Sequence, residues 1–239
     1  MLPLARIRVT EQNRDPRVFA IHSNILEHRS PFLKTLLKPE TEAAGVKSEL
    51  EEERSPEQDI TRTIEFEGSI VAFRLYTEWV YSGLIRTRLL KVEASGAEDI
   101  CFHNIGQAYV LGDKLQDYKF KNAIIELLLN TIITQGKMDL TLPTLVFDNC
   151  SVRAPLRKLL VDLYVLYGHK DWLKSDEPNA TSAVFLSDLS AALLARNSPH
   201  GLRTTNLSVL SACKYYEYPE GQTFPFETNH PREIDEPKP

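Results

Sequence analysis

The side chains best able to do chemistry in this sequence are too scattered to form a catalytic or metal site. Cys101 and His103 are the nearest pairing of a nucleophile or metal ligand with a base. Residues two apart on a helix point in different directions, and no second cluster of ligands completes a zinc site. The glutamates at 51–53 fall in a polar stretch where nothing would perturb their pKa values.

Known nucleotide-binding and hydrolase motifs are also missing from the sequence. GxGxxG, GxxxxGK(S/T), GxSxG and HExxH do not occur. We therefore predict that the chain is not an enzyme and takes no cofactor and no metal ion.

Charge and composition exclude several classes of partner. The chain has 239 residues, a formal net charge of −5 and no cluster of lysine and arginine, so it lacks the electrostatic footprint of a nucleic-acid binder. No apolar run approaches the roughly 20 residues that span a bilayer. Three widely spaced cysteines form no disulfide framework, and no signal peptide is found at residues 1–10. We expect an intracellular protein, cytoplasmic or nuclear, that binds neither nucleic acid directly nor a membrane.

The stretch that positions the other elements is residues 18–37. Its apolar run, 18–21, predicts a strand covered on both faces. Asn24 predicts a helix start, and Ser30 followed by Pro31 predicts a second helix with Ser30 as its N-cap. One apolar face of that second helix should consist of Phe32, Leu33, Leu36 and Leu37.

Strands are predicted on either side of this stretch, because polar and apolar residues alternate over 6–10 and 60–66. A helix should follow over 69–81, with Gly83 as its left-handed C-terminal cap. The apolar pair at 84–85 should then begin a short strand.

Helical periodicity returns in the second half of the chain. It covers 96–133, with a break near Asp117, and then 156–166 and 184–196. The residues of the last helix that should face inward are Phe185, Leu186, Leu189, Ala192 and Leu193.

The organising stretch resembles the signature of the BTB/POZ domain family, most closely as it occurs in short BTB proteins of filamentous fungi. The matching aromatic, histidine, leucine, serine and phenylalanine are Phe19, His22, Leu26, Ser30 and Phe32. In that family the histidine is structural, so the resemblance implies a packed, hydrogen-bonded His22 and not a catalytic base.

Two further stretches carry the resemblance. Trp79, Tyr81 and Gly83 are similar to the family's helix-end motif, in which an aromatic residue, a small residue and a glycine precede a strand. The segment 109–123 resembles the last helices of fungal BTB domains. Its matching residues are Asp113, Lys114, Leu115 and Phe120.

The resemblance implies an α+β fold in which a helical cluster is flanked by a small β-sheet, over residues 1–135. Within it, 40–59 is predicted to be an acidic, disordered insertion. A helical extension is expected over 139–200, and a disordered, proline-rich, acidic tail over 214–239.

The resemblance also implies a protein-interaction module, a scaffold or adaptor without an active site. Its partners would be other proteins, a second copy of the chain, or cullin. Two alternatives stay open: a substrate adaptor of a cullin-based ubiquitin ligase, and a transcriptional co-regulator acting through a DNA-binding partner. An unrecognised enzyme would instead require a concave pocket with convergent polar groups.

One departure from the family affects the expected dimer. The family often places an acidic residue on the first strand and a basic residue directly after the histidine, which together form a charged pocket at the dimer contact. Here Ser23 follows His22, and residues 6–10 contain no aspartate. We therefore do not expect that charged pocket.

Overall fold

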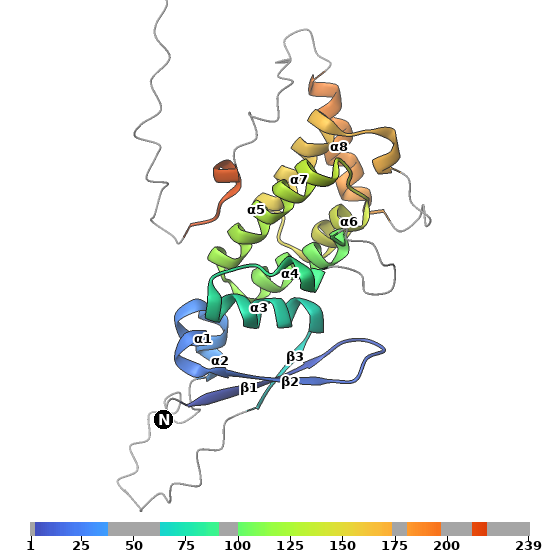
Figure 1. Cartoon of the computed structure of the whole chain (residues 1–239). Coiled ribbons are helices and arrows are strands. Elements are labelled where there is room, and N and C mark those ends of the chain that lie inside the picture. The colour runs from blue at the N-terminus through green and yellow to red at the C-terminus, as the bar shows by residue number, and fades with distance from the viewer. Residues whose placement is uncertain (1–2, 38–62, 91–99, 174–180, 197–211, 219–239) are drawn as a thin grey trace, which may run out of the picture.

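A three-stranded sheet forms one end of the molecule (Figure 1). The computed structural model describes residues 3–37, 63–90, 100–173, 181–196 and 212–218. The strands are β1 (Leu4–Thr10), β2 (Arg17–His22) and β3 (Thr63–Glu67), in the order β2-β1-β3. The central strand, β1, is antiparallel to β2 and parallel to β3. With the helices described below, this sheet confirms the predicted mixed class of helices and strands.

Side-chain alternation along β1 decides which face of the sheet is covered. Ala5, Ile7 and Val9 are buried, whereas Arg6 and Arg8 between them are exposed. This period of two places the apolar residues against the helices and leaves the opposite face to solvent.

The prediction that β2 is covered on both faces is wrong. Ile21 is its only buried residue, and Val18 is 59% exposed. The strand lies next to β1 alone in the described sheet, and Val18 and Ala20, which share one of its faces, are both exposed. Phe19 is half-buried and packs on Phe73, with ring centroids 5.0 Å apart.

Two short helices follow directly, α1 (Ser23–Arg29) and α2 (Pro31–Leu37). Asn24 is not the cap of α1: the helix begins one residue earlier, and His22 stands at the cap position without a side-chain cap bond. The Ser23 hydroxyl donates instead to the main-chain oxygen of Pro3, 3.2 Å away. Tertiary contact with the chain before β1 therefore sets this helix start, in place of the local cap.

The predicted start of α2 at Ser30 is confirmed. The Ser30 hydroxyl accepts from the main-chain N–H of Leu33 at 3.0 Å, as an N-cap does. The predicted inner face is only partly right, because Leu33 is buried while Phe32 is 37% exposed. A helix of two turns can turn only a narrow stripe inward, and Leu33 and its half-buried neighbours Leu36 and Leu37 form that stripe.

Helix α3 (Ile70–Ser82) lies between the sheet and the remaining helices (Figure 1). Ser69 caps its start by accepting from the Ala72 N–H at 3.3 Å. Gly83 ends it with φ of 69°, which a residue without a Cβ adopts at little cost. The short strand predicted after it is not formed: Leu84 is exposed, and the 3₁₀ helix η2 (Thr87–Leu90) follows.

Helices α4 (Phe102–Leu115) and α5 (Tyr118–Gln135) confirm the predicted break near Asp117. Gln116 has a positive φ of 56° and ends α4. Asp117 caps α5 by accepting from the Phe120 N–H at 3.0 Å. The two helices are thereby joined by a tight, well-bonded corner.

The later helices are α6 (Thr141–Asn149), α7 (Pro155–Tyr167) and α8 (Ala183–Arg196), with the 3₁₀ helices η3 (Lys170–Leu173) and η6 (Ala212–Tyr215). Helix α6 packs closely on α4, since a Cβ at Gly106 would lie 2.7 Å from the Leu145 side chain. Helix α8 packs on α7. One hydrophobic core runs without interruption from the sheet to α8.

The inner face of α8 is narrower than predicted. Phe185 and Leu189 are buried, but Leu186 and Leu193 are about 40% exposed. The helix has few described neighbours besides α6 and α7, so only one stripe is covered.

The predicted disordered tail is wrong at its beginning. Tyr215, inside the predicted range 214–239, is buried against α5 and α7. An aromatic ring that finds an apolar surface gains enough from burial to hold the chain in place. Residues 219–239 and the predicted acidic insertion 40–59 lie outside the described residues. Among the described helices, none has the length and apolarity needed to cross a membrane.

Candidate functional site

His22 and Tyr81, two residues of the BTB-like pattern, meet at the junction of sheet and helices. The Tyr81 hydroxyl lies 2.8 Å from His22 Nδ1 and accepts from the main-chain N–H of His22 at 3.1 Å. His22 is therefore a structural, hydrogen-bonded residue that ties the start of α1 to the end of α3.

Trp79 and Phe120 also come together, inside the core. Their ring centroids are 5.2 Å apart, and Tyr76 packs on both rings. The guanidinium of Arg29, from α1, lies 4.6 Å from the Trp79 ring centroid. This stacking of a cation on an aromatic face joins α1 to α3.

Ser30 and Leu115 form a third long-range pair. The Ser30 hydroxyl donates to the main-chain oxygen of Leu115 at 2.5 Å, and both residues are fully buried. A helix end leaves carbonyl groups without helical partners, and this bond satisfies one of them at the end of α4. Ser30 thus joins the start of α2 to the end of α4.

The remaining pattern residues are placed as follows. Leu26 is buried, and Gly83 caps α3. Asp113 pairs with Lys121, whereas Lys114 and Phe32 lie on the surface. The structure therefore gives most of the pattern residues a packing role.

A shallow depression lies beside these contacts, between α1 and α3. It has a volume of about 430 Å³ and is lined by Asn24, Ile25, His28, Arg29 and Val80. These lining residues include no carboxylate, hydroxyl or thiol group.

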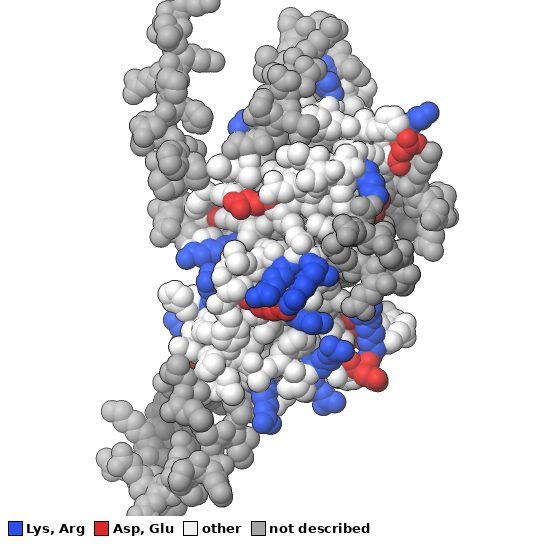
Figure 2. Space-filling model, in the orientation of Figure 1, with Lys and Arg blue, Asp and Glu red and all other residues white. Residues whose placement is uncertain are grey.

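Exposed side chains extend this surface at the end of α3. Tyr81 is 49% exposed and Leu84 is 66% exposed. We call the depression together with Tyr81 and Leu84 the α1–α3 surface. Most of the face seen in Figure 2 is uncharged, and its most prominent charged group, mainly Lys and Arg, lies near the middle of the view.

Cys101 and His103 are the pair considered first for chemistry. Cys101 is half-buried just before α4, and His103 is exposed, with Nε2 3.3 Å from the Gln107 amide. In the part of the chain that the structure describes, no three potential ligands are grouped to hold a metal ion. Burial, with the charge of Asp113 next in importance, raises the pKa of the Cys150 thiol to about 12 and makes it a poor nucleophile.

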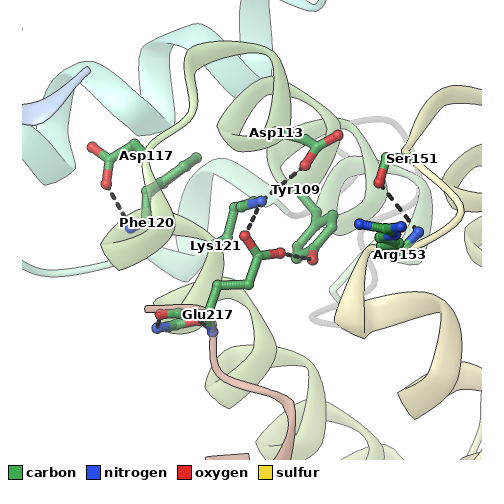
Figure 3. A network of polar contacts seen from close by, with 9 residues as sticks. Tyr109, Asp113, Asp117, Phe120, Lys121, Ser151, Arg153 and Glu217 are labelled. Atoms are coloured by element: carbon green, nitrogen blue, oxygen red, sulfur yellow. Dashed lines mark hydrogen bonds and ion pairs between the residues drawn. The ribbon is translucent and has the colours of Figure 1, made fainter. Parts of the chain in front are cut away.

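Sequence reasoning missed a polar network between α4, α5 and residue 217 (Figure 3). Lys121 is 6% exposed and lies 2.8 Å from Asp113. It also forms an ion pair with Glu217, whose other carboxylate oxygen accepts from the Tyr109 hydroxyl at 3.1 Å. Burial alone would lower the pKa of Lys121, but its bonds and attraction to the two carboxylates outweigh burial and raise it. The available signal was the tyrosine pair at 215–216, because aromatic rings favour burial.

Comparison of this chain with models of protein families and with curated proteins found no match.

Proposed function

We propose that this chain is a non-enzymatic protein-interaction module of the BTB/POZ type. It acts as a scaffold or adaptor that holds a protein partner, or a second copy of itself, on the α1–α3 surface. The observation that carries the proposal is the depression between α1 and α3, followed at the end of α3 by the exposed side chains of Tyr81 and Leu84. Exposed apolar groups on rigid elements are typical of protein-docking sites.

The order of elements supports the family assignment. Two strands lead into a pair of short helices, and a third strand and a long helix follow. The BTB resemblance implies the same beginning, with a helical cluster against a small sheet. Two pairs of its pattern residues are in contact, His22 with Tyr81 and Trp79 with Phe120. These contacts support the idea that the pattern residues hold the fold together.

The free cysteines support a reducing compartment as the setting. The described chain pairs none of Cys101, Cys150 and Cys213 in a disulfide. A cytoplasmic or nuclear protein keeps its thiols in that state, and we propose that location.

Two experiments test the proposal: light scattering on the purified chain, and affinity capture of its partners. We expect either a dimer or a specific captured protein, with loss of either in the Leu84→Asp variant. A stable contact needs about 800 Å² on each partner, and a charge buried at its centre would disrupt it. Val152→Asp is the matched control, because Val152 is 86% exposed and lies between α6 and α7.

A strictly monomeric chain that captures the same proteins with and without Leu84→Asp would refute the proposed surface. Purified cullin in the same capture assay separates the ubiquitin-ligase adaptor from a scaffold of another kind. The adaptor alternative requires saturable binding of cullin to the wild-type chain.

A further inference from the structure

Residues 212–218, which we call the docked segment, lie on α5 and α7 although they are far away in the sequence (Figure 1). They contain the 3₁₀ helix η6 and end in a short stretch without helix or strand. The contacts of this segment resemble those of a bound peptide more than those of a core element. They consist of one buried aromatic ring and a set of directional polar bonds.

The side chain of Asn122 forms hydrogen bonds with the main chain of the docked segment. Its side-chain amide donates to the main-chain oxygen of Glu217 at 2.9 Å and accepts from the main-chain N–H of the same residue at 2.8 Å. This pair of bonds resembles the two bonds that one strand residue exchanges with another, and it depends on the main chain of Glu217 and not on its side chain.

The side chain of Glu217 is recognised separately. One carboxylate oxygen pairs with the buried Lys121 ammonium, and the other accepts from the Tyr109 hydroxyl at 3.1 Å. Figure 3 shows the carboxylate pointing between these two groups. Charge-assisted bonds of this kind in a partly dry site select strongly for a carboxylate.

A tyrosine two positions earlier supplies the apolar anchor. Tyr215 is 4% exposed, and its hydroxyl donates to Asp162 on α7 at 2.7 Å. The hydroxyl of Tyr216 bonds Glu126 on α5. The site therefore selects a tyrosine at the end of a 3₁₀ turn and a glutamate two positions later, while the residue between them contributes only an exposed bond.

The site would remain formed if the docked segment left it. Lys121 stays paired with Asp113, which lies 2.8 Å away on α4, so no buried charge is left alone. Water can bond the Asn122 amide and the Tyr109 hydroxyl. The segment can thus leave without the large free-energy cost of a buried Lys121 ammonium that has no partner.

We propose that α4, α5 and α7 form a binding groove for acidic peptide segments with the pattern tyrosine–any residue–glutamate, and that the docked segment occupies it as a built-in, exchangeable ligand. A protein partner carrying the same pattern would displace it. This groove is separate from the α1–α3 surface, and the inference does not depend on the scaffold role.

Peptide binding to the full chain tests this groove. The probe is a fluorescently labelled peptide of residues 211–219 with Cys213→Ser, measured by polarisation. A tethered ligand competes at an effective concentration on the order of millimolar. We therefore expect the double variant Tyr215→Ala, Glu217→Ala to bind the probe about tenfold or more tighter than the wild-type chain.

Two matched changes make the result specific. Adding Asn122→Ala to the double variant should abolish binding, whereas adding Asn130→Ala, an exposed residue of the same helix, should leave it unchanged. A probe carrying Glu217→Gln should also bind at least tenfold more weakly. Equal affinity of wild type and double variant, or binding that survives Asn122→Ala, would overturn the proposal.

Hydrogen exchange on the wild-type chain provides a second measurement that needs no variant. Amides of residues 215–218 should exchange by local opening, faster than the core of α4, and faster still with excess unlabelled peptide. If these amides exchange only on global unfolding and do not respond to the peptide, the segment is a fixed part of the core and the proposal fails.

Discussion

The hydroxyl of Tyr81 bonds both the ring and the main chain of His22, 59 residues away in the sequence. One oxygen therefore holds the end of β2, the start of α1 and the end of α3 together. This point borders the α1–α3 surface, so the geometry of the surface depends on it.

Tyr81→Phe should destabilise the fold by about 1 kcal/mol, because it removes one hydroxyl with two partners at a partly exposed site. Chemical denaturation followed by circular dichroism measures this change. Tyr118→Phe on α5 is the control, since the structure shows no hydrogen bond of that hydroxyl to a described residue. Equal stability of wild type and Tyr81→Phe would mean that the His22 contact contributes nothing to folding.

Ser30→Ala should cost more, about 2 kcal/mol, because the lost hydroxyl serves two main-chain groups at once. The N–H of Leu33 loses its cap, and the buried carbonyl of Leu115 loses its donor. Urea denaturation is again the measurement.

Ser190→Ala is the matched control for Ser30, because Ser190 is exposed and bonds only within its own helix. A change within about 0.5 kcal/mol is expected there. If both variants lose the same stability, the bond between α2 and α4 contributes no more to folding than a hydrogen bond within one exposed helix.

Local signals explain which parts of this fold could be predicted from sequence. Ser30 with Pro31 and Ser69 with Gly83 mark helix ends correctly, since a cap is formed by residues next to one another. The break at Asp117 follows the same logic. These features need no knowledge of the rest of the molecule.

Contacts between distant segments explain what could not be predicted. Residue type alone predicts that Val18 and Phe32 face the core, yet Val18 is 59% exposed and Phe32 is 37% exposed. Glu217 was assigned to a disordered tail by composition, but Lys121 and Asn122 bind it across about 95 residues. Apolar or acidic character alone does not say which partner a side chain meets.

Asp117 should make the stability depend on pH in acid. Burial is the largest influence on its pKa and raises it, against bonds from Phe120 and Tyr76 that lower it. A carboxyl whose pKa is higher in the folded state stabilises the fold below its unfolded pKa of 3.8. That contribution is lost as the pH rises through the folded pKa.

Comparison with Asp117→Asn isolates this effect, because asparagine cannot titrate but can still cap α5. The free energy of unfolding of the wild type, minus that of the variant, should fall as the pH rises above 3.8 and then level off. Urea denaturation between pH 3 and 7 measures it. A difference that rises with pH would show that hydrogen bonding, and not burial, controls this carboxylate.

The three cysteines should differ in their reaction with iodoacetamide at pH 8. Cys213 is exposed and should be labelled first, with the half-buried Cys101 more slowly. Burial and the nearby charge of Asp113 raise the pKa of Cys150 to about 12, so only about one molecule in ten thousand carries its thiolate at this pH.

Peptide mapping by mass spectrometry resolves the order of labelling. In urea, where burial is lost, all three thiols should react at similar rates, which shows that the folded structure protects Cys150. Cys213→Ser is the control, because it removes the fastest site and should leave the labelling of Cys150 unchanged. Labelling of native Cys150 as fast as Cys213 would mean that α6 opens readily and that the core between α4 and α6 is looser than the packing at Gly106 implies.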